Sequence, residues 1–348
     1  MSNHILVTGG AGFIGSNFVN YLIENELYRD KKIVVLDKLT YAGDLDNLST
    51  SLDNPRVTFI HGDVNDALLI DKLVRDSHTI VHFAAETHVT RSLHDSRTFV
   101  QTDILGTHNI LSAIAKYIDN VFSFIHISTS EVYGTAISET MKESHPLNPL
   151  SPYAAAKCGA DRMVHSFVAS FDVPAFIVRP FNNYGPHQHT EKLIARTITS
   201  ILQGEDITLH GSGGASRDWV FVRDTCKFIS ELMLRNPRLL SRNQRVINFG
   251  SGVSTSVSEI AELTLKLMGK VPYTGKIVKI KDRPGQVDCH RANASYAVNL
   301  KLPAAHTTLH EGLKLTINWY KVNQDWWKKR ESNKRIEIVL PNGEIIEH

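Results

Sequence analysis

The chain has 348 residues, 42% of them hydrophobic, and its 38 basic and 36 acidic side chains leave a formal charge of +2. Because no long block of one sign occurs, neither nucleic acid nor a membrane is expected as a partner. Three widely spaced cysteines without a C-x-x-C pair argue against a disulfide framework, and no metal site is predicted. No run approaches about 18 apolar residues and no signal peptide is recognisable, so a cytoplasmic protein is expected.

Short apolar runs alternate with helical stretches through the first half of the chain. The runs lie at 5–8, 32–37, 57–60, 79–83, 122–127 and 175–178, and residues 245–250 are expected to return to the same sheet. Strands separated by helical segments form βαβ units, which bind ligands at the carboxyl ends of their parallel strands. We therefore predict an α/β fold with a Rossmann-type, doubly wound parallel sheet. Beyond residue 180 the mixed texture predicts a smaller, interleaved C-terminal substrate lobe.

A glycine-rich turn, Gly9 to Gly15, follows the first predicted strand and opens a helix. Glycines let the backbone approach a pyrophosphate, and the helix N-terminus offers free N–H groups. Asp37 ends the next predicted strand, where a carboxylate can accept hydrogen bonds from a ribose and repel a 2′-phosphate. This favours NAD over NADP, although the neighbouring Lys38 weakens that preference. The alternative is a plain glycine-rich turn with Asp37 as a loop acid.

Two further segments fit the same pocket. Asp63-Val64 follows the third strand, where an acid can meet the adenine amine. Ala84, Ala85 and Glu86 follow the fourth strand, where small residues let a cofactor lie against the backbone. Either signal alone is weak, but their order along the chain supports a dinucleotide site.

Tyr153 and Lys157 lie four positions apart, at i and i+4, which places a phenol and an ammonium on one face of a predicted helix. A free tyrosine has a pKa of about 10. A nearby ammonium, together with the positive nicotinamide of NAD, favours the phenolate, so Tyr153 can act as a base near neutral pH. The alternative is an ordinary exposed helix pair.

Hydroxyl side chains and one carboxylate follow the fifth strand, in the segment from Ser128 to Gly134. Hydroxyls at the carboxyl end of a strand point into the cleft of such a fold. Glu131 is the unusual element, because an alcohol dehydrogenase needs no carboxylate beside its tyrosine. It suggests a second proton transfer, such as removal of an acidic proton next to a new ketone. The alternative is a helix-capping or surface acid.

These residues together resemble the extended short-chain dehydrogenase/reductases that act on nucleotide sugars, over about residues 3–322. Within that group the chain is most similar to the nucleotide-diphosphate-hexose 4,6-dehydratases, of which dTDP-glucose 4,6-dehydratase is the best-known type. The similarity is carried further by segments at 84–89, 91–92, 128–134, 182–186, 191–194, 211–219 and 282–285.

The resemblance implies a redox-neutral reaction, in which NAD-dependent oxidation at C4 is followed by elimination of water across C5–C6 and reduction at C6. Tyr153 would take the proton of the 4-hydroxyl, Thr129 would orient it, and Glu131 would remove the C5 proton. The catalytic residues predicted are Thr129, Ser130, Glu131, Tyr153 and Lys157.

The same patterns and resemblance place the ligands. NAD is expected against Gly9, Gly12, Phe13, Ile14, Gly15, Asp37, Lys38, Leu39, Thr40, Asp63, Val64, Ala84, Ala85, Glu86, Thr102, Tyr153, Lys157 and Asn183. The nucleotide-diphosphate sugar is expected against His88, Asn182, Lys192, Leu193, Arg217, Asn248 and Arg283. Arginines suit the diphosphate because their planar fork matches phosphate oxygens.

Two positions depart from the family pattern. The dTDP-glucose enzymes carry an aspartic acid between the threonine and the glutamate, which protonates the departing hydroxyl; here the residue is Ser130. The departure leaves the substrate open, and either Glu131 or a water could be the acid. Asp103 stands where the family usually has asparagine, and the sequence offers no account of it.

Three other activities fit parts of the pattern. A nucleotide-sugar decarboxylase or 4-epimerase would share the first oxidation, but an epimerase usually lacks the carboxylate at Glu131. A non-catalytic NAD-sensing protein would have no need of Thr129, Tyr153 and Lys157 together. The dehydratase-like segments at 182–194 and 217–219 favour elimination.

The domain division predicted is an NAD-binding Rossmann domain at 1–180 plus about 218–250. A nucleotide-sugar-binding lobe takes 181–217 and 251–325, and a C-terminal extension takes 326–348. Residues 335–346 alternate around Asn342-Gly343, which is a hairpin signal. The resemblance implies a homodimer, in which the helices at 106–117 and 154–170 form a four-helix bundle with a second copy.

Overall fold

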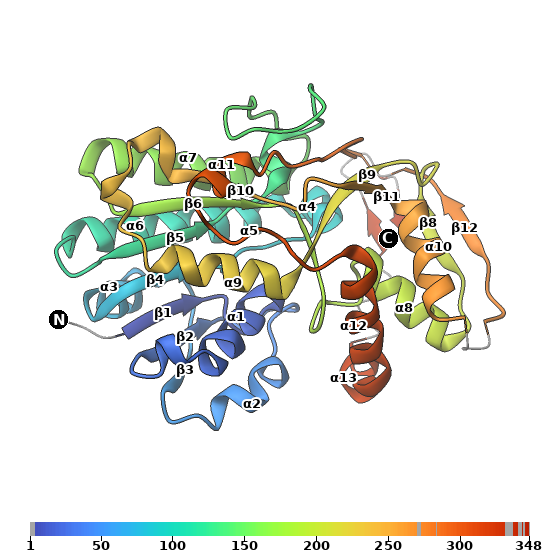
Figure 1. Cartoon of the computed structure of the whole chain (residues 1–348), viewed down its shortest axis with the longest axis horizontal. Helices are drawn as coiled ribbons and strands as arrows, with labels where there is room; N and C mark the ends of the chain where they lie inside the picture. The colour runs from blue at the N-terminus through green and yellow to red at the C-terminus, as the bar shows by residue number, and fades with distance from the viewer. Residues whose placement is uncertain are drawn as a thin grey trace.

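Seven parallel strands form the central sheet of the protein (Figure 1). The computed structural model describes residues 4–269, 273–282, 284–330, 337–339, 343 and 345–347. The strand order is β10-β6-β5-β4-β1-β2-β3, and every neighbouring pair is parallel. The strands are β1 (His4–Thr8), β2 (Lys32–Asp37), β3 (Val57–His61), β4 (Ser77–His82), β5 (Ser123–Ile127), β6 (Ala175–Pro180) and β10 (Val246–Phe249). The predicted doubly wound sheet is confirmed, including the return of the chain at β10.

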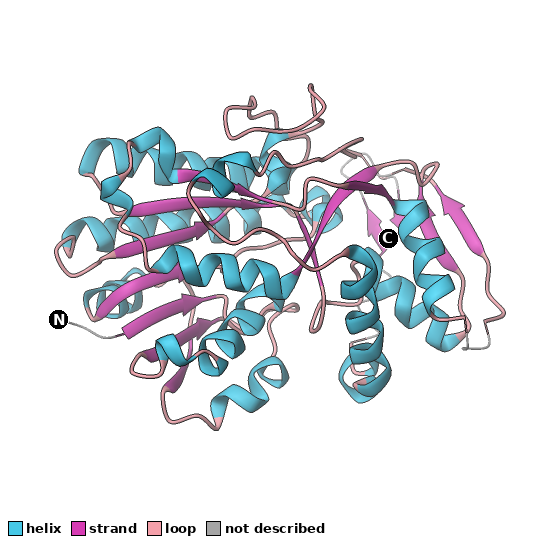
Figure 2. Cartoon of the chain, in the orientation of Figure 1, coloured by secondary structure: helices cyan, strands magenta, loops and turns pink. Residues whose placement is uncertain are grey.

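Helices cover both faces of this sheet (Figures 1 and 2). One face carries α3 (Ala67–Arg75), α6 (Gly106–Lys116) and α7 (Pro152–Phe171), and the other carries α1 (Phe13–Glu24) and α9 (Val222–Met233). Shorter helices are α2 (Ser49–Leu52), α4 (Val89–His94), α5 (Ser96–Phe99) and α11 (Ser295–Asn299). A π-helical segment, Val100–Leu105, joins α5 to α6.

The strands are apolar on both faces, because helices lie on both sides of the sheet. Ile5 and Val7 of β1 pack in the cluster on the α1–α9 side, whereas Leu6 between them packs on the α3–α6–α7 side. In β5, Ile125 likewise packs on the α1–α9 side and Phe124 on the α3–α6–α7 side. Successive side chains of a strand point to opposite faces, and burying each contributes roughly 1.5–3 kcal/mol. The near-continuous apolar runs in the sequence are the consequence.

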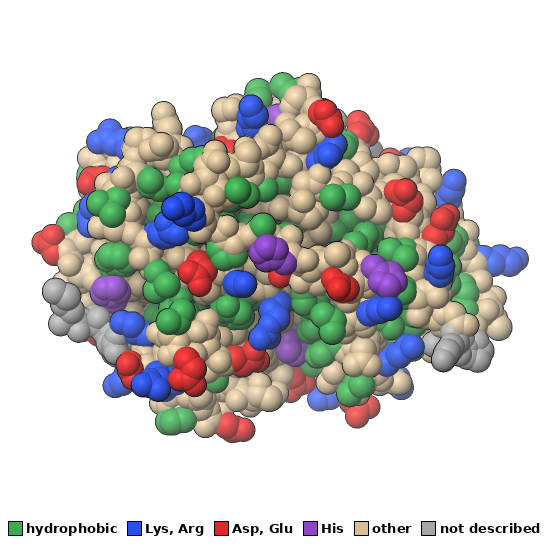
Figure 3. All heavy atoms as spheres, viewed as in Figure 1, with side chains coloured by type: hydrophobic (Ala, Val, Ile, Leu, Met, Phe, Trp, Pro, Cys, Tyr) green, Lys and Arg blue, Asp and Glu red, His purple; other side chains and the backbone are tan. Residues whose placement is uncertain are grey.

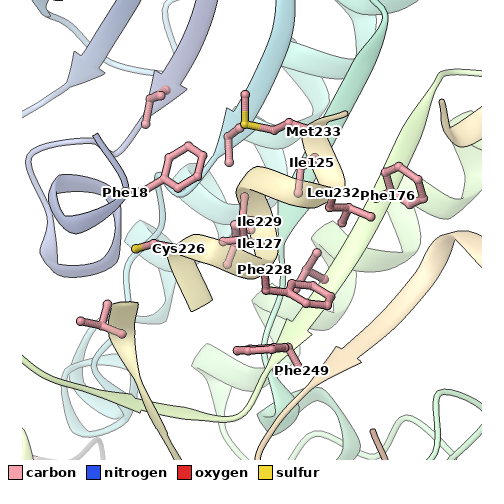
Figure 4. Close-up of a cluster of buried hydrophobic side chains, with 14 of the residues drawn as sticks. Phe18, Ile125, Ile127, Phe176, Cys226, Phe228, Ile229, Leu232, Met233 and Phe249 are labelled. Atoms are coloured by element: carbon pink, nitrogen blue, oxygen red, sulfur yellow. The ribbon is translucent and has the colours of Figure 1, made fainter. Parts of the chain in front are cut away.

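Figure 4 shows how α9 covers its face of the sheet. Phe228 and Ile229 of α9 point toward the strands, beside Ile125 and Ile127 of β5. Phe228 stacks on Phe249 of β10 with ring centroids 4.4 Å apart. A helix that begins beyond residue 220 therefore packs on a sheet of which six strands come from the first 180 residues and the seventh is β10, which interleaves the two halves of the chain.

The smaller lobe lies beyond the carboxyl ends of the parallel strands (Figure 1). It contains the helices α8 (Leu193–Gln203), α10 (Val257–Leu267), α12 (Leu309–Val322) and α13 (Gln324–Lys328). Its strands are β7 (Asn182–Tyr184), β8 (Ile207–His210), β9 (Ser216–Phe221), β11 (Ser254–Ser256) and β12 (Ile277–Ile280). Tyr184, Ile198, Leu313, Tyr320 and Trp327 are buried in a core of its own.

Near the C-terminus, β13 (Glu337–Val339) pairs antiparallel with β14 (Ile345–Glu347). Gly343, between them, has the positive φ of 83° that glycine adopts readily in a turn. Asn342 and the remainder of the predicted hairpin signal lie outside the described residues. The boundaries assigned to the domains stay a prediction.

Charged side chains of both signs are interspersed over the face of the molecule in Figure 3. Within the described part of the chain, no helix combines the length and the apolar character needed to cross a bilayer.

Candidate active site

A cavity of about 430 Å³ opens where the carboxyl ends of the parallel strands meet the lobe. Its walls come from the strand ends of the sheet, from α7, and from the lobe elements β7, α8, β8 and β9. All the described site residues predicted from the sequence line it, except Leu39 and Asn248. Arg283 lies outside the described residues.

The glycine-rich turn is packed too tightly for any side chain at two of its positions. A Cβ at Gly9 would overlap the backbone of Ala84, and Gly9 also has a φ of +70°. A Cβ at Gly15 would overlap the carbonyl oxygen of Gly9. The turn therefore lies directly against the strand end of β4 and leaves its outer face, at the start of α1, open to the cavity. This is the cradle that a dinucleotide pyrophosphate requires.

Asp37 holds the cradle in place as well as facing the cavity. Its Oδ2 accepts from the Ala11 N–H at 2.9 Å and its Oδ1 from the Leu39 N–H at 2.8 Å. Burial raises the pKa of this carboxyl, and the backbone hydrogen bonds partly offset that rise. Leu39 contributes this N–H, but its side chain packs against the hydrophobic core, which is why it does not line the cavity.

Lys38 forms an ion pair with Asp63, with Nζ 2.6 Å from Oδ2. The ammonium that weakened the preference for NAD is therefore engaged by a carboxylate from the next strand end. The cradle, Asp37 and this pair fit the adenosine and pyrophosphate of NAD.

Tyr153 and Lys157 both belong to α7, as predicted, and both are buried. Lys157 Nζ donates to the carbonyl oxygen of Ile127 at 2.7 Å, at the end of β5. The Tyr153 phenol and the Thr129 hydroxyl both line the cavity, and the hydroxyl lies near enough to lower the pKa of the phenol. Burial raises the pKa of Tyr153 above its usual range, and burial also lowers the pKa of Lys157. The neighbouring Thr129 hydroxyl lowers the pKa of Tyr153, but the rise caused by burial is larger. The lowering expected from Lys157 together with the nicotinamide of NAD stays a prediction.

Asp103 lies in the π-helical segment beside α7 and is buried. Its Oδ1 accepts from the Glu86 N–H at 2.9 Å, and its Oδ2 has no hydrogen-bond partner among the described residues. Burial raises the pKa of Asp103, and the charge of Lys157 opposes that rise. π-helical turns often occur at functional sites. Asp103 thus places a second carboxyl close enough to influence the Lys157 ammonium.

Ser130 and Glu131 meet a histidine that the sequence gave no reason to select. His290 comes from the C-terminal half and is fully buried. Its Nδ1 lies 3.2 Å from Ser130 Oγ and 4.0 Å from Glu131 Oε1, and its Nε2 lies 2.9 Å from the Gly134 carbonyl oxygen. Arg217 of β9 approaches the same carboxylate, with Nε 4.0 Å from Oε1. Glu131 therefore faces one cationic and one titratable partner from the lobe side of the cleft.

Glu191 is the centre of a second buried polar cluster on the lobe side. Its Oε1 accepts from the Tyr41 hydroxyl at 3.2 Å, and its Oε2 lies 3.3 Å from His88 Nε2. Arg91 stacks over the Tyr41 ring, with its guanidinium carbon 4.0 Å from the centroid. Lys192, next in the chain, donates to the Thr87 carbonyl at 3.0 Å. Glu191 and Tyr41 were missed as site residues, although Glu191 adjoins the predicted Lys192.

Asn248 is buried in β10 and its side chain is fully occupied within the fold. Its Oδ1 accepts from the Tyr133 hydroxyl at 2.7 Å, and its Nδ2 donates to the Met141 carbonyl at 2.9 Å. These bonds turn the amide toward the loop before α7, and the structure does not bring Asn248 to the cavity. Among the described residues, no group of three His, Cys, Asp or Glu side chains is arranged to hold a metal ion.

Comparison with known proteins gives relatives that match along almost the whole chain. The family model described as GDP-mannose 4,6 dehydratase matches residues 6–314. A dTDP-glucose 4,6-dehydratase from Streptomyces antibioticus is 37% identical over 98% of this chain and 99% of its own. The low-salt glycan biosynthesis protein Agl12 from Haloferax volcanii is 40% identical over 91% of this chain and 98% of its own.

A solved structure gives the same result in three dimensions. DesIV, a dTDP-glucose 4,6-dehydratase from Streptomyces venezuelae crystallised with NAD and TYD, has a TM-score of 0.86 and 35% identity. The match covers 94% of this chain and 99% of that one. The fold, the glycine-rich cradle and the pair of Tyr153 and Lys157 together define an NAD-dependent enzyme of the extended short-chain dehydrogenase/reductase class. Within that class, the chain belongs to the nucleotide-sugar 4,6-dehydratase family.

Proposed function

We propose that this enzyme converts a nucleotide-diphosphate hexose into its 4-keto-6-deoxy derivative by eliminating water across C5–C6. The observation that carries the proposal is Glu131, a cavity-lining carboxylate directly beside the hydroxyl of Thr129 and the buried Tyr153. Oxidation of an alcohol needs only the latter two. The Glu131 carboxylate at this place supplies the base for a further step.

The chemistry that NAD supplies when bound is to accept the hydrogen of C4 at the start and return it to C6 at the end. Tyr153 takes the proton of the 4-hydroxyl, and the neighbouring Thr129 hydroxyl orients that group. Lys157 is anchored on the Ile127 carbonyl at the base of the site. The low exposure of Tyr153 and Lys157 excludes bulk water from the oxidation step.

Elimination then follows from the new 4-ketone, which acidifies the C5–H bond. Glu131 takes the C5 proton, the released electron pair forms the C5–C6 double bond, and the C6–O bond breaks. The departing oxygen needs one proton to leave as water, and C5 must take up one proton when C6 receives the hydride. Arg217, with Nε 4.0 Å from Glu131 Oε1, stabilises the carboxylate electrostatically when it is charged.

The orientation of the Ser130 hydroxyl decides where that proton comes from. The Gly134 carbonyl can only accept, so His290 Nε2 carries the hydrogen of the neutral ring. Burial lowers the pKa of His290, which keeps the ring neutral near pH 7. Nδ1 is therefore an acceptor, and Ser130 donates its hydroxyl hydrogen to it. Ser130 presents only lone pairs to the cleft, which supports Glu131 as the group that returns the proton.

The nucleotide diphosphate is proposed to bind on the lobe side of the cavity. Arg217 and Lys192 supply positive charge there, and Asn182 supplies an amide. A dTDP-hexose is the first substrate to test, because the relatives of known activity act on dTDP-glucose. Ser130, which replaces the family aspartate, is the reason to include other nucleotides.

The test is incubation of the purified enzyme with dTDP-, UDP-, GDP- and CDP-hexoses, followed by mass spectrometry of the product. The proposal expects one of these to lose water and gain a 4-ketone, with no net reduction of NAD. Release of carbon dioxide from a uronic acid substrate would instead identify a decarboxylase. A product of unchanged mass would identify a 4-epimerase.

A further inference from the structure

The loop that follows β2 forms part of the cofactor side of the cavity. Lys38, Thr40, Ala42 and Gly43 of this loop line the cavity wall next to the glycine-rich turn. We call residues 38–48 the cofactor loop. Its second half turns away from the cavity and contacts a segment from the opposite end of the chain.

The cofactor loop is joined to the glycine-rich turn through one carbonyl. The Ala11 carbonyl oxygen accepts from the Asp44 N–H at 3.1 Å and from Asn47 Nδ2 at 2.7 Å. The Ala11 N–H in turn donates to Asp37 at 2.9 Å. The turn that cradles the pyrophosphate and the loop beside it are therefore held as one unit, and a shift of the loop disturbs the cradle.

Two side chains from the C-terminal end of the lobe contact the cofactor loop. Trp326 of α13 donates its indole N–H to Asn47 Oδ1 at 2.8 Å. Arg330, only 7% exposed, forms an ion pair with the Asp44 carboxylate and lies 4.2 Å over the Trp326 ring. Asn47 is buried, so loss of the indole N–H would leave its amide oxygen without a partner.

The support for these side chains is rigid. Trp327, their neighbour, is fully buried in the lobe core and donates its indole N–H to the Tyr320 carbonyl at 2.8 Å. Tyr320 belongs to α12 and packs in the same core. Trp326 and Arg330 therefore project from a fixed base, and the cofactor loop cannot leave the cavity wall without breaking their contacts.

We propose that Trp326 and Arg330 are positioning residues for the cofactor, which latch the cofactor loop over the site and slow the release of NAD. Both lie beyond residues 6–314, the part of the chain that the family model matches. Retention of the cofactor by this latch depends neither on the sugar nor on the elimination step.

The experiment measures the rate at which NADH leaves the loaded protein when excess NAD displaces it, followed by NADH fluorescence without any sugar. Trp326→Phe keeps an aromatic ring but removes the indole N–H together with the five-membered ring that carries it. Arg330→Met keeps a long stem and removes the charge. Each is expected to release NADH about tenfold faster, the effect of losing one buried hydrogen bond or charge pair. Arg330→Lys is expected to restore part of the retention.

Lys329→Met is the matched control, since Lys329 pairs with Asp46 of the same loop at 3.3 Å but its side chain is 67% exposed. Such an exposed pair contributes little, so its release rate should equal that of the wild type. Circular dichroism confirms that each variant is folded, and Trp326→Phe carries the test if Arg330→Met does not fold. The latch would be overturned if the folded Trp326 and Arg330 variants released NADH at the wild-type rate. It would also be overturned if Lys329→Met accelerated NADH release as much as they do.

Discussion

Ser130 and Glu131 are adjacent in the chain but have different chemical capacities in the site. Ser130 gives its hydroxyl hydrogen to His290 and faces the cleft as an acceptor. Glu131 has a carboxylate that can take a proton and return it. The two residues are therefore expected to have different roles, although both were predicted as catalytic.

Replacement of each residue tests this separation. Ser130→Ala should keep dehydration within about tenfold of the wild type, because it removes one hydrogen bond and no proton donor. Glu131→Gln should lower turnover by roughly a hundredfold to ten-thousandfold and let reduced cofactor accumulate after the oxidation. Absorbance of the reduced cofactor and product mass are measured together. If Ser130→Ala were as inactive as Glu131→Gln, Ser130 would be the proton donor.

Asp103 offers a second prediction at the scale of a single residue. Burial raises the pKa of its carboxyl to about 7, above its unfolded value near 3.8. A carboxyl with a raised pKa in the folded state stabilises the fold only while protonated, and this contribution is lost as pH rises through that window. Asp103→Asn should therefore stabilise the protein more at pH 8 than at pH 5, by roughly 1–3 kcal/mol.

Chemical denaturation of Asp103→Asn and of the wild type at the two pH values measures this difference. Asparagine keeps an oxygen to accept from the Glu86 N–H, so the local geometry is retained. Equal effects of the substitution at both pH values would show that Asp103 stays ionised in the fold. The sequence marked this position as a departure from the family, but it could not show that the carboxyl is buried.

At the scale of elements, the turn between β1 and α1 decides cofactor binding. Gly9→Ala should abolish NAD binding and lower the free energy of unfolding, because its Cβ would overlap the Ala84 backbone. Gly252→Ala is the matched control, with a similar φ of +76° but no heavy atom nearer than 3.7 Å. It carries only the backbone strain, about 1 kcal/mol. Calorimetric titration with NAD and urea unfolding measure the NAD affinity and the free energy of unfolding of both variants. Equal losses of affinity and stability in the two variants would contradict the overlap with the Ala84 backbone.

The elements themselves follow well from the sequence, because their signals are local. The apolar runs became strands, and the Tyr153–Lys157 spacing fell on a helix. Contacts between distant segments could not be predicted in this way. His290 reaches Ser130 across 160 residues, and Trp326 reaches Asn47 across 279. The resemblance also assigned Asn248 to the substrate, whereas its amide is occupied by Tyr133 and Met141 in this fold.

At the scale of the whole molecule, the cleft needs both halves of the chain. The sheet and α7 supply the cradle and the oxidising pair, while Arg217, Lys192 and His290 come from beyond residue 180. We propose in addition that α6 and α7 pack against the same helices of a second copy. Phe171, at the end of α7, is 56% exposed. Light scattering after size exclusion should give twice the chain mass, and a mass of one chain would contradict the dimer.

Transfer of the C4 hydrogen tests the central claim most directly. The substrate identified in the nucleotide panel is prepared with deuterium at C4, and the product is examined by mass spectrometry and NMR. A redox-neutral 4,6-dehydratase must lose water and carry the deuterium to the C6 methyl group, with no net reduction of NAD. A product that keeps its full mass, or one that leaves the deuterium on the cofactor, would contradict the account.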